Sequence, residues 1–281
     1  SISIEDLSSN VIAAPETALD DENTRITIDY TDPEIQALGI VSSSETSFAK
    51  SGEAVTVTLQ AKLDLRVADG VSGTIGGISA SPTRQSSTIW VLEATMGGSH
   101  PEGAIEFAIT MLDMAGNSTS ITHADITDET SITYDKTLPE ITEISILSDN
   151  DNSSYAKDDD LITLGFTTDS DLIVDPTVQI MGRAATQSSA VEKEYVYTLT
   201  MDKAVDDNGQ VTVSIDFTDE AGNIGLTVTE DDIGLNITYD ETDPYLTYVS
   251  IRSSNLDTTY AKETETITVK LKDATNSLGF F

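Results

Sequence analysis

Apolar and polar residues alternate along most of this chain, and the alternation recurs about every 106 residues. In residues 54–61, for example, Val55, Val57 and Leu59 alternate with polar neighbours. A period of two is typical of β-strands with one buried face, and no segment shows a convincing helical period. The predicted strands are 24–28, then 35–41, 54–61, 71–80, 90–96, 105–111, 118–122 and 131–134, then 141–147, 161–167, 177–185, 195–201 and 211–217, and finally 246–251 and 266–271.

Three landmarks recur in a constant order. The first is the turn Asp219-Glu220-Ala221-Gly222-Asn223, which has a near copy at 113–117 and a degenerate (worn) copy without the Gly at 6–10. The Asn positions of the three copies lie 107 and 106 residues apart. The second is an Asp-x-Thr-x-Pro linker at 29–33, 135–139 and 240–244, and the third is an aromatic-Ala-Lys triplet at 48–50, 155–157 and 260–262. One order at one period indicates tandem repeats. We therefore divide the chain into 1–28, the end of one repeat; 29–134 and 135–239, two full repeats; and 240–281, the start of a further repeat.

Each full repeat holds about seven short strands separated by turn residues. This density predicts a Greek-key β-sandwich of the immunoglobulin type. The fold class expected is thus all-β, with tandem immunoglobulin-like sandwiches and incomplete repeats at both ends. Trp90 and Tyr195 occupy matching inward positions and are expected in the cores, whereas Gly76 and Gly77 suggest a bulge or a close backbone approach within strand 71–80.

The landmarks also carry a resemblance. The aromatic-Ala-Lys triplet, "DFTDEAGN" at Asp216–Asn223 and "YDETDP" at Tyr239–Pro244 are similar to tandem Ig-like repeats of large secreted or cell-surface proteins of bacteria and archaea, including adhesins and surface-layer proteins. The resemblance implies an extracellular structural or adhesive role, as spacer, stalk, surface layer or fibre, with neighbouring repeats or surface glycans and proteins as partners. The alternative is a carbohydrate-binding accessory module of a secreted enzyme. The worn first turn and Leu138 in the second linker depart from the pattern.

The incomplete ends allow one more partner, a copy of the same chain. Residues 1–28 offer last strands and residues 240–281 offer first strands of one domain type. Head-to-tail pairing of copies would bury both edges and build a fibre. Simple truncation of a longer chain explains the same pattern.

The charge excludes some partners. The chain has 49 acidic against 14 basic side chains and a net charge of −35, and residues 135–239 are its most acidic part. Such a chain repels nucleic-acid phosphates and anionic membranes but attracts divalent cations. It has no cysteine, hence no disulfide or thiolate metal site, and no apolar run long enough to span a membrane, so direct membrane insertion is not expected.

Candidate catalytic residues are scarce. The two histidines, His100 and His123, both lie in the first repeat, and no Ser-His-Asp set or phosphate loop can be assembled, so an enzyme is not expected. The repeated lysines Lys50, Lys157 and Lys262 raise the idea of isopeptide bonds, but a bond to a local carbonyl or carboxylate is the expectation. Glycosylation sequons begin at Asn117, Asn152 and Asn236 and matter only in a glycosylating host.

Acidic residues cluster where the predicted topology brings loops together. The Asp-to-Asn turn, the incoming linker and the loop after the second strand share one end of each sandwich. The turn Asp and Asn have a purely structural explanation, since they cap the turn. The other explanation is Ca²⁺ at the domain junctions, because calcium accepts roughly six to eight oxygen ligands. The candidate ligands are Asp29, Asp32, Asp113 and Asn117; Asp135, Asp169, Asp171, Asp219 and Asn223; and, at the next linker, Asp240 and Asp243.

The acidic runs at 149–152 and 158–160 lack the Gly and Glu of an EF-hand loop, so that motif is rejected. Strand order places both runs at the opposite end of the second sandwich, facing the next linker. We expect most of these side chains to form a hydrated acidic loop.

Overall fold

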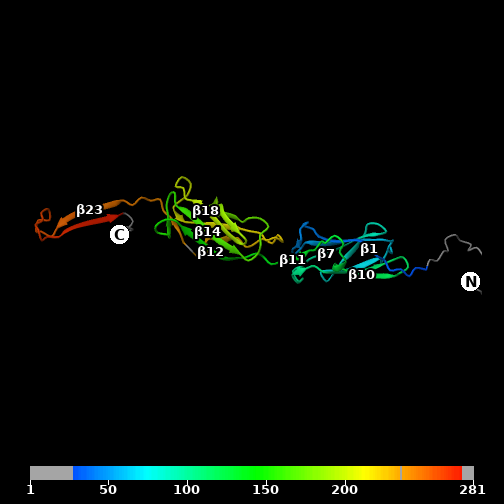
Figure 1. Ribbon diagram of the computed structural model, residues 1–281. Helices are drawn as coiled ribbons and strands as arrows, with labels where there is room; N and C mark the ends of the chain where they lie inside the picture. The colour runs from blue at the N-terminus through cyan, green and yellow to red at the C-terminus, as the bar shows by residue number, and fades with distance from the viewer. Residues whose placement is uncertain (1–27, 235, 274–281) are drawn as a thin grey trace, which may run out of the picture. The chain divides into compact units, whose positions relative to one another are not determined.

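The computed structural model describes residues 28–234 and 236–273 and divides between Lys136 and Thr137 into two units (Figure 1). Each unit contains one sandwich, which we call the first and the second. Strands dominate both, which confirms the all-β prediction. The worn turn at 6–10 and nearly all of the strand expected at 24–28 lie outside the described residues.

The first sandwich packs two antiparallel four-stranded sheets. One sheet has the order β1 (Ile35–Ser42), β3 (Ala54–Ala61), β7 (Ile89–Thr95) and β6 (Ser81–Arg84). The other has the order β10 (Ser118–Thr122), β9 (Phe107–Leu112), β4 (Val71–Ile75) and β5 (Ile78–Ser79). In immunoglobulin lettering these are A-B-E-D and G-F-C-C′, so the predicted Greek key is confirmed.

Short strands close one end of this sandwich. The last strand, β11 (Thr133–Tyr134), runs parallel to β2 (Phe48–Ala49) and antiparallel to β8 (Gly103–Ala104). The aromatic-Ala pair of the third landmark is β2 itself. A single 3₁₀ turn, η1 (His123–Asp125), precedes the last strand.

The second sandwich repeats this arrangement. Its sheets have the orders β12-β14-β18-β17 and β16-β15-β20-β21, and the closing strands have the order β13-β22-β19. A short helix, α1 (Glu230–Ile233), stands where η1 stands in the first sandwich. The bounds are β12 (Ile141–Ser148), β13 (Tyr155–Ala156), β14 (Leu161–Thr168), β15 (Thr177–Ile180), β16 (Arg183–Ala184), β17 (Thr186–Val191), β18 (Glu194–Thr200), β19 (Gly209–Gln210), β20 (Val213–Asp216), β21 (Val228–Thr229) and β22 (Thr238–Tyr239).

The alternating apolar residues form the cores. Trp90 is 4% exposed and Tyr195 6%, which confirms both as core residues. Phe166 stacks against the rings of Tyr195 and Tyr197, with centroids 5.5 and 6.0 Å apart. Aromatic rings supply large buried apolar areas, so these sandwiches hold together without disulfides.

Two features of the strands were not predicted. The segment 71–80 is a hairpin rather than one bulged strand, because Gly76 and Gly77 take φ of 58° and 80° and make a two-residue turn between β4 and β5. Met181 and Gly182 make the same turn in the second sandwich, at φ of 52° and 70°.

The edge strands β6 and β17 were missed because they are almost wholly exposed and carry no alternating apolar pattern.

The described part of the third repeat is a hairpin of β23 (Leu246–Ser253) and β24 (Ile267–Asp273). It has the same register as β12 and β14, including a shift near its start. Ile251 and Val269 are 68% and 54% exposed, whereas Ile146 and Leu164, at the corresponding positions, are 6% and 0% exposed.

Candidate functional site

The Asp-to-Asn turn is a closed hydrogen-bonded unit in both sandwiches. Asp219 is 1% exposed, and one carboxylate oxygen accepts the Asn223 backbone N–H at 2.8 Å while the other accepts Asn223 Nδ2 at 2.9 Å. Asp113 makes the same two contacts with Asn117, at 2.9 and 2.8 Å, and also accepts the Gly116 N–H at 2.7 Å. The structural explanation of the turn is therefore sufficient for these carboxylates.

The hydrogen bonds of this turn affect the titration of Asp113. Its burial opposes ionisation, but hydrogen bonds from the Asn117 side chain and from the turn amides outweigh it and lower the pKa of the carboxyl below its usual value. The ionised form is thus held by neutral donors. A cation in the turn would compete with those donors for the same oxygens.

The incoming linker of the first sandwich meets this turn, as strand order predicted. Asn117 Nδ2 donates to the Asp29 carbonyl at 3.2 Å, and Thr119 Oγ1 donates to the Pro33 carbonyl at 2.6 Å. In the second sandwich, the Glu220 N–H donates to the Asp171 carbonyl at 3.3 Å, and the Asp169 carboxylate accepts the Glu140 N–H at 2.8 Å. The linker and the loops therefore meet at this end of each sandwich, but most of the contacts between them involve backbone groups.

The remaining candidate ligands lie elsewhere. Asp135 and Asp240 each follow a closing strand and donate their backbone N–H to Ala49 and Ala156, at 3.0 and 2.9 Å. Asp32 and Asp243 are exposed beside the linker prolines. In residues 28–234 and 236–273, no three acidic or histidine side chains converge in an arrangement that could hold a metal ion.

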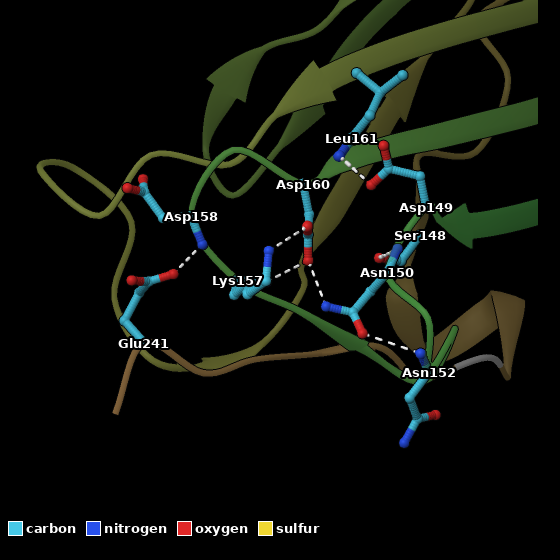
Figure 2. A network of polar contacts seen from close by, with 9 residues as sticks. All are labelled: Ser148, Asp149, Asn150, Asn152, Lys157, Asp158, Asp160, Leu161 and Glu241. Atoms are coloured by element: carbon cyan, nitrogen blue, oxygen red, sulfur yellow. Dashed lines mark hydrogen bonds and ion pairs between the residues drawn. The ribbon is translucent and has the colours of Figure 1, made fainter. Parts of the chain in front are cut away.

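The third landmark holds an arrangement that was not predicted. In the second sandwich it consists of Asn150, Lys157 and Asp160, and we call it the loop clasp (Figure 2). Asp160 is 8% exposed, and its carboxylate accepts Asn150 Nδ2 at 2.6 Å, the Lys157 N–H at 2.8 Å and Lys157 Nζ at 3.1 Å. Asp149 accepts the Leu161 N–H at 2.7 Å. Asp160 is therefore an exception to the expected hydrated acidic loop, because it is buried and accepts several donors, whereas Asp149, Asp151 and Asp159 are exposed.

The clasp recurs in all three copies of the third landmark, each of which lies in the described part of the chain. In the first, Glu53 accepts the Lys50 N–H at 3.1 Å and the Ser44 hydroxyl at 3.2 Å. In the third, Glu265 accepts the Lys262 N–H at 2.8 Å and Asn255 Nδ2 at 2.9 Å. The constant element is an acid three residues after the lysine. That spacing is visible in the sequence and was the missed signal.

The clasp brings a lysine, an acid and an asparagine together, which are the groups that an isopeptide bond would need. The hydrogen bond and charge of Asp160 raise the pKa of Lys157. Burial opposes the ionisation of Asp160, but hydrogen bonds from Asn150 and Lys157 lower its pKa. Both groups are therefore charged near neutrality, and an ammonium ion has no lone pair to attack an amide. The expected bond between lysine and a local carboxylate is confirmed for Lys157.

The linker leaving the second sandwich is fastened to it beside the clasp. Glu241 accepts the Asp158 N–H through its carboxylate and donates its own N–H to Asn208 Oδ1 at 2.8 Å. Asn208 Nδ2 in turn donates to Thr242 Oγ1 at 2.9 Å. Lys203 forms an ion pair with Asp158 at 2.6 Å.

The linker leaving the first sandwich is fastened with different side chains. Lys136 Nζ donates to the carbonyls of Gly98 and His100, both at 2.7 Å, and its N–H donates to Glu102 at 2.9 Å. Tyr134, one residue before the linker, donates its hydroxyl to the Gly97 carbonyl at 2.8 Å. His100 belongs to the same loop as Gly97 and Gly98 and lies edge-on to the Tyr134 ring. His123 instead packs against the ring of Phe107.

Comparisons with known proteins add the following. No family model matches the chain, and no curated protein matches it. Similar solved structures include the fibronectin(III)-like modules of Clostridium thermocellum CbhA, at 10% identity and a TM-score of 0.33 over 72% of this chain and 94% of that one. Bacteroides ovatus SGBP-B, solved with a mixed-linkage heptasaccharide, has 13% identity and a TM-score of 0.19 over 74% and 46%.

The extracellular region of plexin A4 has 12% identity and a TM-score of 0.25. That similarity covers 83% of this chain and 18% of the plexin chain, so this chain spans a small part of it. The immunoglobulin-like sandwich is assigned from the strand order of the two sheets.

Proposed function

We propose that this chain is a non-enzymatic, extracellular array of Ig-like modules that acts as a spacer or stalk in an adhesin, surface layer or fibre. The observation that carries the proposal is the fastening of both outgoing linkers. Lys136 and Glu241 each bind their linker to the sandwich that precedes it. None of the helices in the described part of the chain is long and apolar enough to cross a membrane.

Fastened linkers suit a spacer for an energetic reason. Fixing the backbone of one residue costs about 1–2 kcal/mol of conformational entropy. Hydrogen bonds inside each module offset part of this cost before any neighbour or partner binds. Linkers with restricted backbones allow fewer orientations between successive modules. A stalk needs this restriction to hold its far end at a defined distance, whereas a freely jointed chain does not.

Calcium at the junctions is a further part of the proposal. Its support is the net charge of −35 and the exposed carboxylates of Asp32 and Asp243 in two linkers. Asp113 and Asp219 already accept internal donors, so the linker carboxylates and carbonyls would supply the ligands. Bound calcium would reduce repulsion between the acids and restrict the linkers.

Small-angle X-ray scattering tests both parts of the proposal. A spacer array gives a narrow distribution of maximum dimension in the apo chain, and calcium narrows it further and raises the melting temperature. Magnesium at equal ionic strength controls for screening. A broad distribution typical of freely jointed modules contradicts the spacer, whereas unchanged scattering and melting with calcium contradict only the ion. Tight, selective binding on a glycan array would favour the carbohydrate-binding alternative.

A further inference from the structure

Three asparagines of this chain begin the tripeptide that accepts N-linked glycans, and their surroundings differ. Glycosylation replaces one hydrogen of the side-chain Nδ2 with a bulky sugar. An acceptor therefore needs an Nδ2 that is free of internal partners and a tripeptide that stands clear of the sandwich. These two requirements separate Asn117, Asn152 and Asn236.

Asn117 fails the first requirement. Its Nδ2 donates to Asp113 Oδ2 at 2.8 Å and to the Asp29 carbonyl at 3.2 Å. One hydrogen thus closes the turn and the other joins the turn to the incoming linker. A sugar on this nitrogen would remove one of these bonds and push the linker away.

Asn236 fails the second requirement. Its side chain is exposed and accepts Gln210 Nε2 at 2.8 Å, but the next residue, Ile237, is buried. Thr238, the third residue of the tripeptide, belongs to β22, which lies between β13 and β19. Its N–H donates to the Ser154 carbonyl at 2.9 Å. The tripeptide is therefore held within the closing sheet.

Asn152 has a free Nδ2, and its tripeptide stands clear of the sandwich except at the Ser154 carbonyl, which accepts the Thr238 N–H; we propose that it is the N-glycan acceptor of this chain. Asn152, Ser153 and Ser154 are all exposed in the loop between β12 and β13. The Asn152 side chain points away from the loop clasp (Figure 2), and its Nδ2 has no hydrogen-bond partner among the described residues. Its Oδ1 accepts the Ser154 N–H at 3.3 Å, which fixes the amide while leaving the nitrogen outward.

The proposal rests on the extracellular location proposed above, because the reaction needs a secretory membrane. The donor is a sugar on a lipid-linked diphosphate. A bond forms between Asn152 Nδ2 and the anomeric carbon, and the bond from that carbon to the diphosphate oxygen breaks. The lipid diphosphate leaves with the electron pair, and one amide proton passes to a base of the transferase.

The full 281-residue chain, secreted by a cell that N-glycosylates, provides the test. Release of glycans by peptide N-glycosidase in H₂¹⁸O converts each modified Asn into ¹⁸O-labelled Asp, which peptide mass spectrometry locates. We expect label at Asn152 and none at Asn117 or Asn236. Asn152→Gln and Ser154→Ala should each abolish the label, while Ser153→Ala, which leaves the motif intact, should keep it.

Secreted, folded protein with unlabelled Asn152, or with label at Asn117, would overturn the assignment. Far-ultraviolet circular dichroism shows whether each variant has folded. Neither result touches the spacer proposal, which scattering and calcium titration test separately.

Discussion

Glu241 occupies the linker position that Lys136 occupies one repeat earlier, and the two side chains fasten their linkers with opposite charge. Lys136 reaches the carbonyls of Gly98 and His100, whereas Glu241 accepts the N–H of Asp158. The charged groups around the two side chains also differ. Glu102 accepts the Lys136 N–H, and Lys203 lies beside Asp158.

Reversal of the Glu241 charge should release the linker at 240–244 from the second sandwich. In Glu241→Lys the carboxylate that accepts the Asp158 N–H is lost, and an ammonium group is placed near Lys157 and Lys203, which the Glu241 charge now stabilises. The loss of one such contact costs about 1 kcal/mol locally, roughly a fivefold change in opening. Hydrogen–deuterium exchange should therefore be several-fold faster at Asp158 and at residues 240–243.

The control for this variant is Glu194→Lys, which makes the same charge change at an exposed position in β18. It should leave exchange at Asp158 and in the linker unaltered. Equal acceleration in both variants would mean that net charge, and not the Glu241 contact, governs the linker.

The loop clasp should make the second sandwich sensitive to acid. The pKa of Asp160 is lowered from 3.8, so its ionised form contributes stability that is full above about pH 4 and is lost as the pH falls through the lowered value. Asp160→Asn removes this contribution and leaves the Lys157 N–H with a poorer acceptor. Its melting temperature should be lower at pH 7, and the difference from the wild type should shrink toward pH 2.

Asp159→Asn is the matched control, because Asp159 is exposed, directly precedes Asp160 in the same loop and has a φ of 66°, which Asn tolerates. Calorimetry from pH 7 to pH 2 should show wild-type behaviour for it. A constant difference between wild type and Asp160→Asn at every pH would show that the Asp160 charge is not what the clasp uses.

The sequence identified those features that depend on alternation and on backbone conformation. Trp90 and Tyr195 alternate with polar residues and are buried, and the Gly of the Asp-to-Asn turn marks a bend that the structure contains. The edge strand β17 was missed because only one of its faces touches protein and its residues are mostly small and polar. Edge strands are defined by a neighbour, which a local pattern cannot show.

The acidic groups were the hardest to interpret. Asp158, Asp159 and Asp160 form one run in sequence, yet Asp160 is buried, Asp158 is half-buried and paired with Lys203, and Asp159 is exposed. A carboxylate becomes buried when several donors converge on it, and those donors come from Asn150 and Lys157 on both sides of the loop. Net charge carries no information about such convergence.

Removal of the turn carboxylate should destabilise the second sandwich strongly. Asp219→Ala removes the acceptor of two hydrogen bonds in a buried turn, one from the Asn223 backbone N–H and one from Asn223 Nδ2. A hydrogen bond to a charged group contributes about 1.5–3 kcal/mol, and two such bonds are lost here. We expect a lower denaturant midpoint with an unchanged slope. The neighbouring exposed Glu220, changed to Ala, should stay within about 0.5 kcal/mol of the wild type, and equal losses would refute the role of the turn carboxylate.

A close backbone approach in the first sandwich should make any side chain at Gly73 destabilising. A Cβ there would lie 2.4 Å from the Ala108 carbonyl oxygen and 2.8 Å from Ile109 Cα, and both are backbone atoms of the adjoining strand that cannot rotate away. Gly73→Ala should therefore cost about 1–3 kcal/mol, as overpacking does. Trp90, the single tryptophan, reports the unfolding of this sandwich alone by its fluorescence. Gly98→Ala, with nothing within 4 Å of its Cβ, should unfold like the wild type, and an undiminished midpoint in Gly73→Ala would show that β4 and β9 can separate without cost.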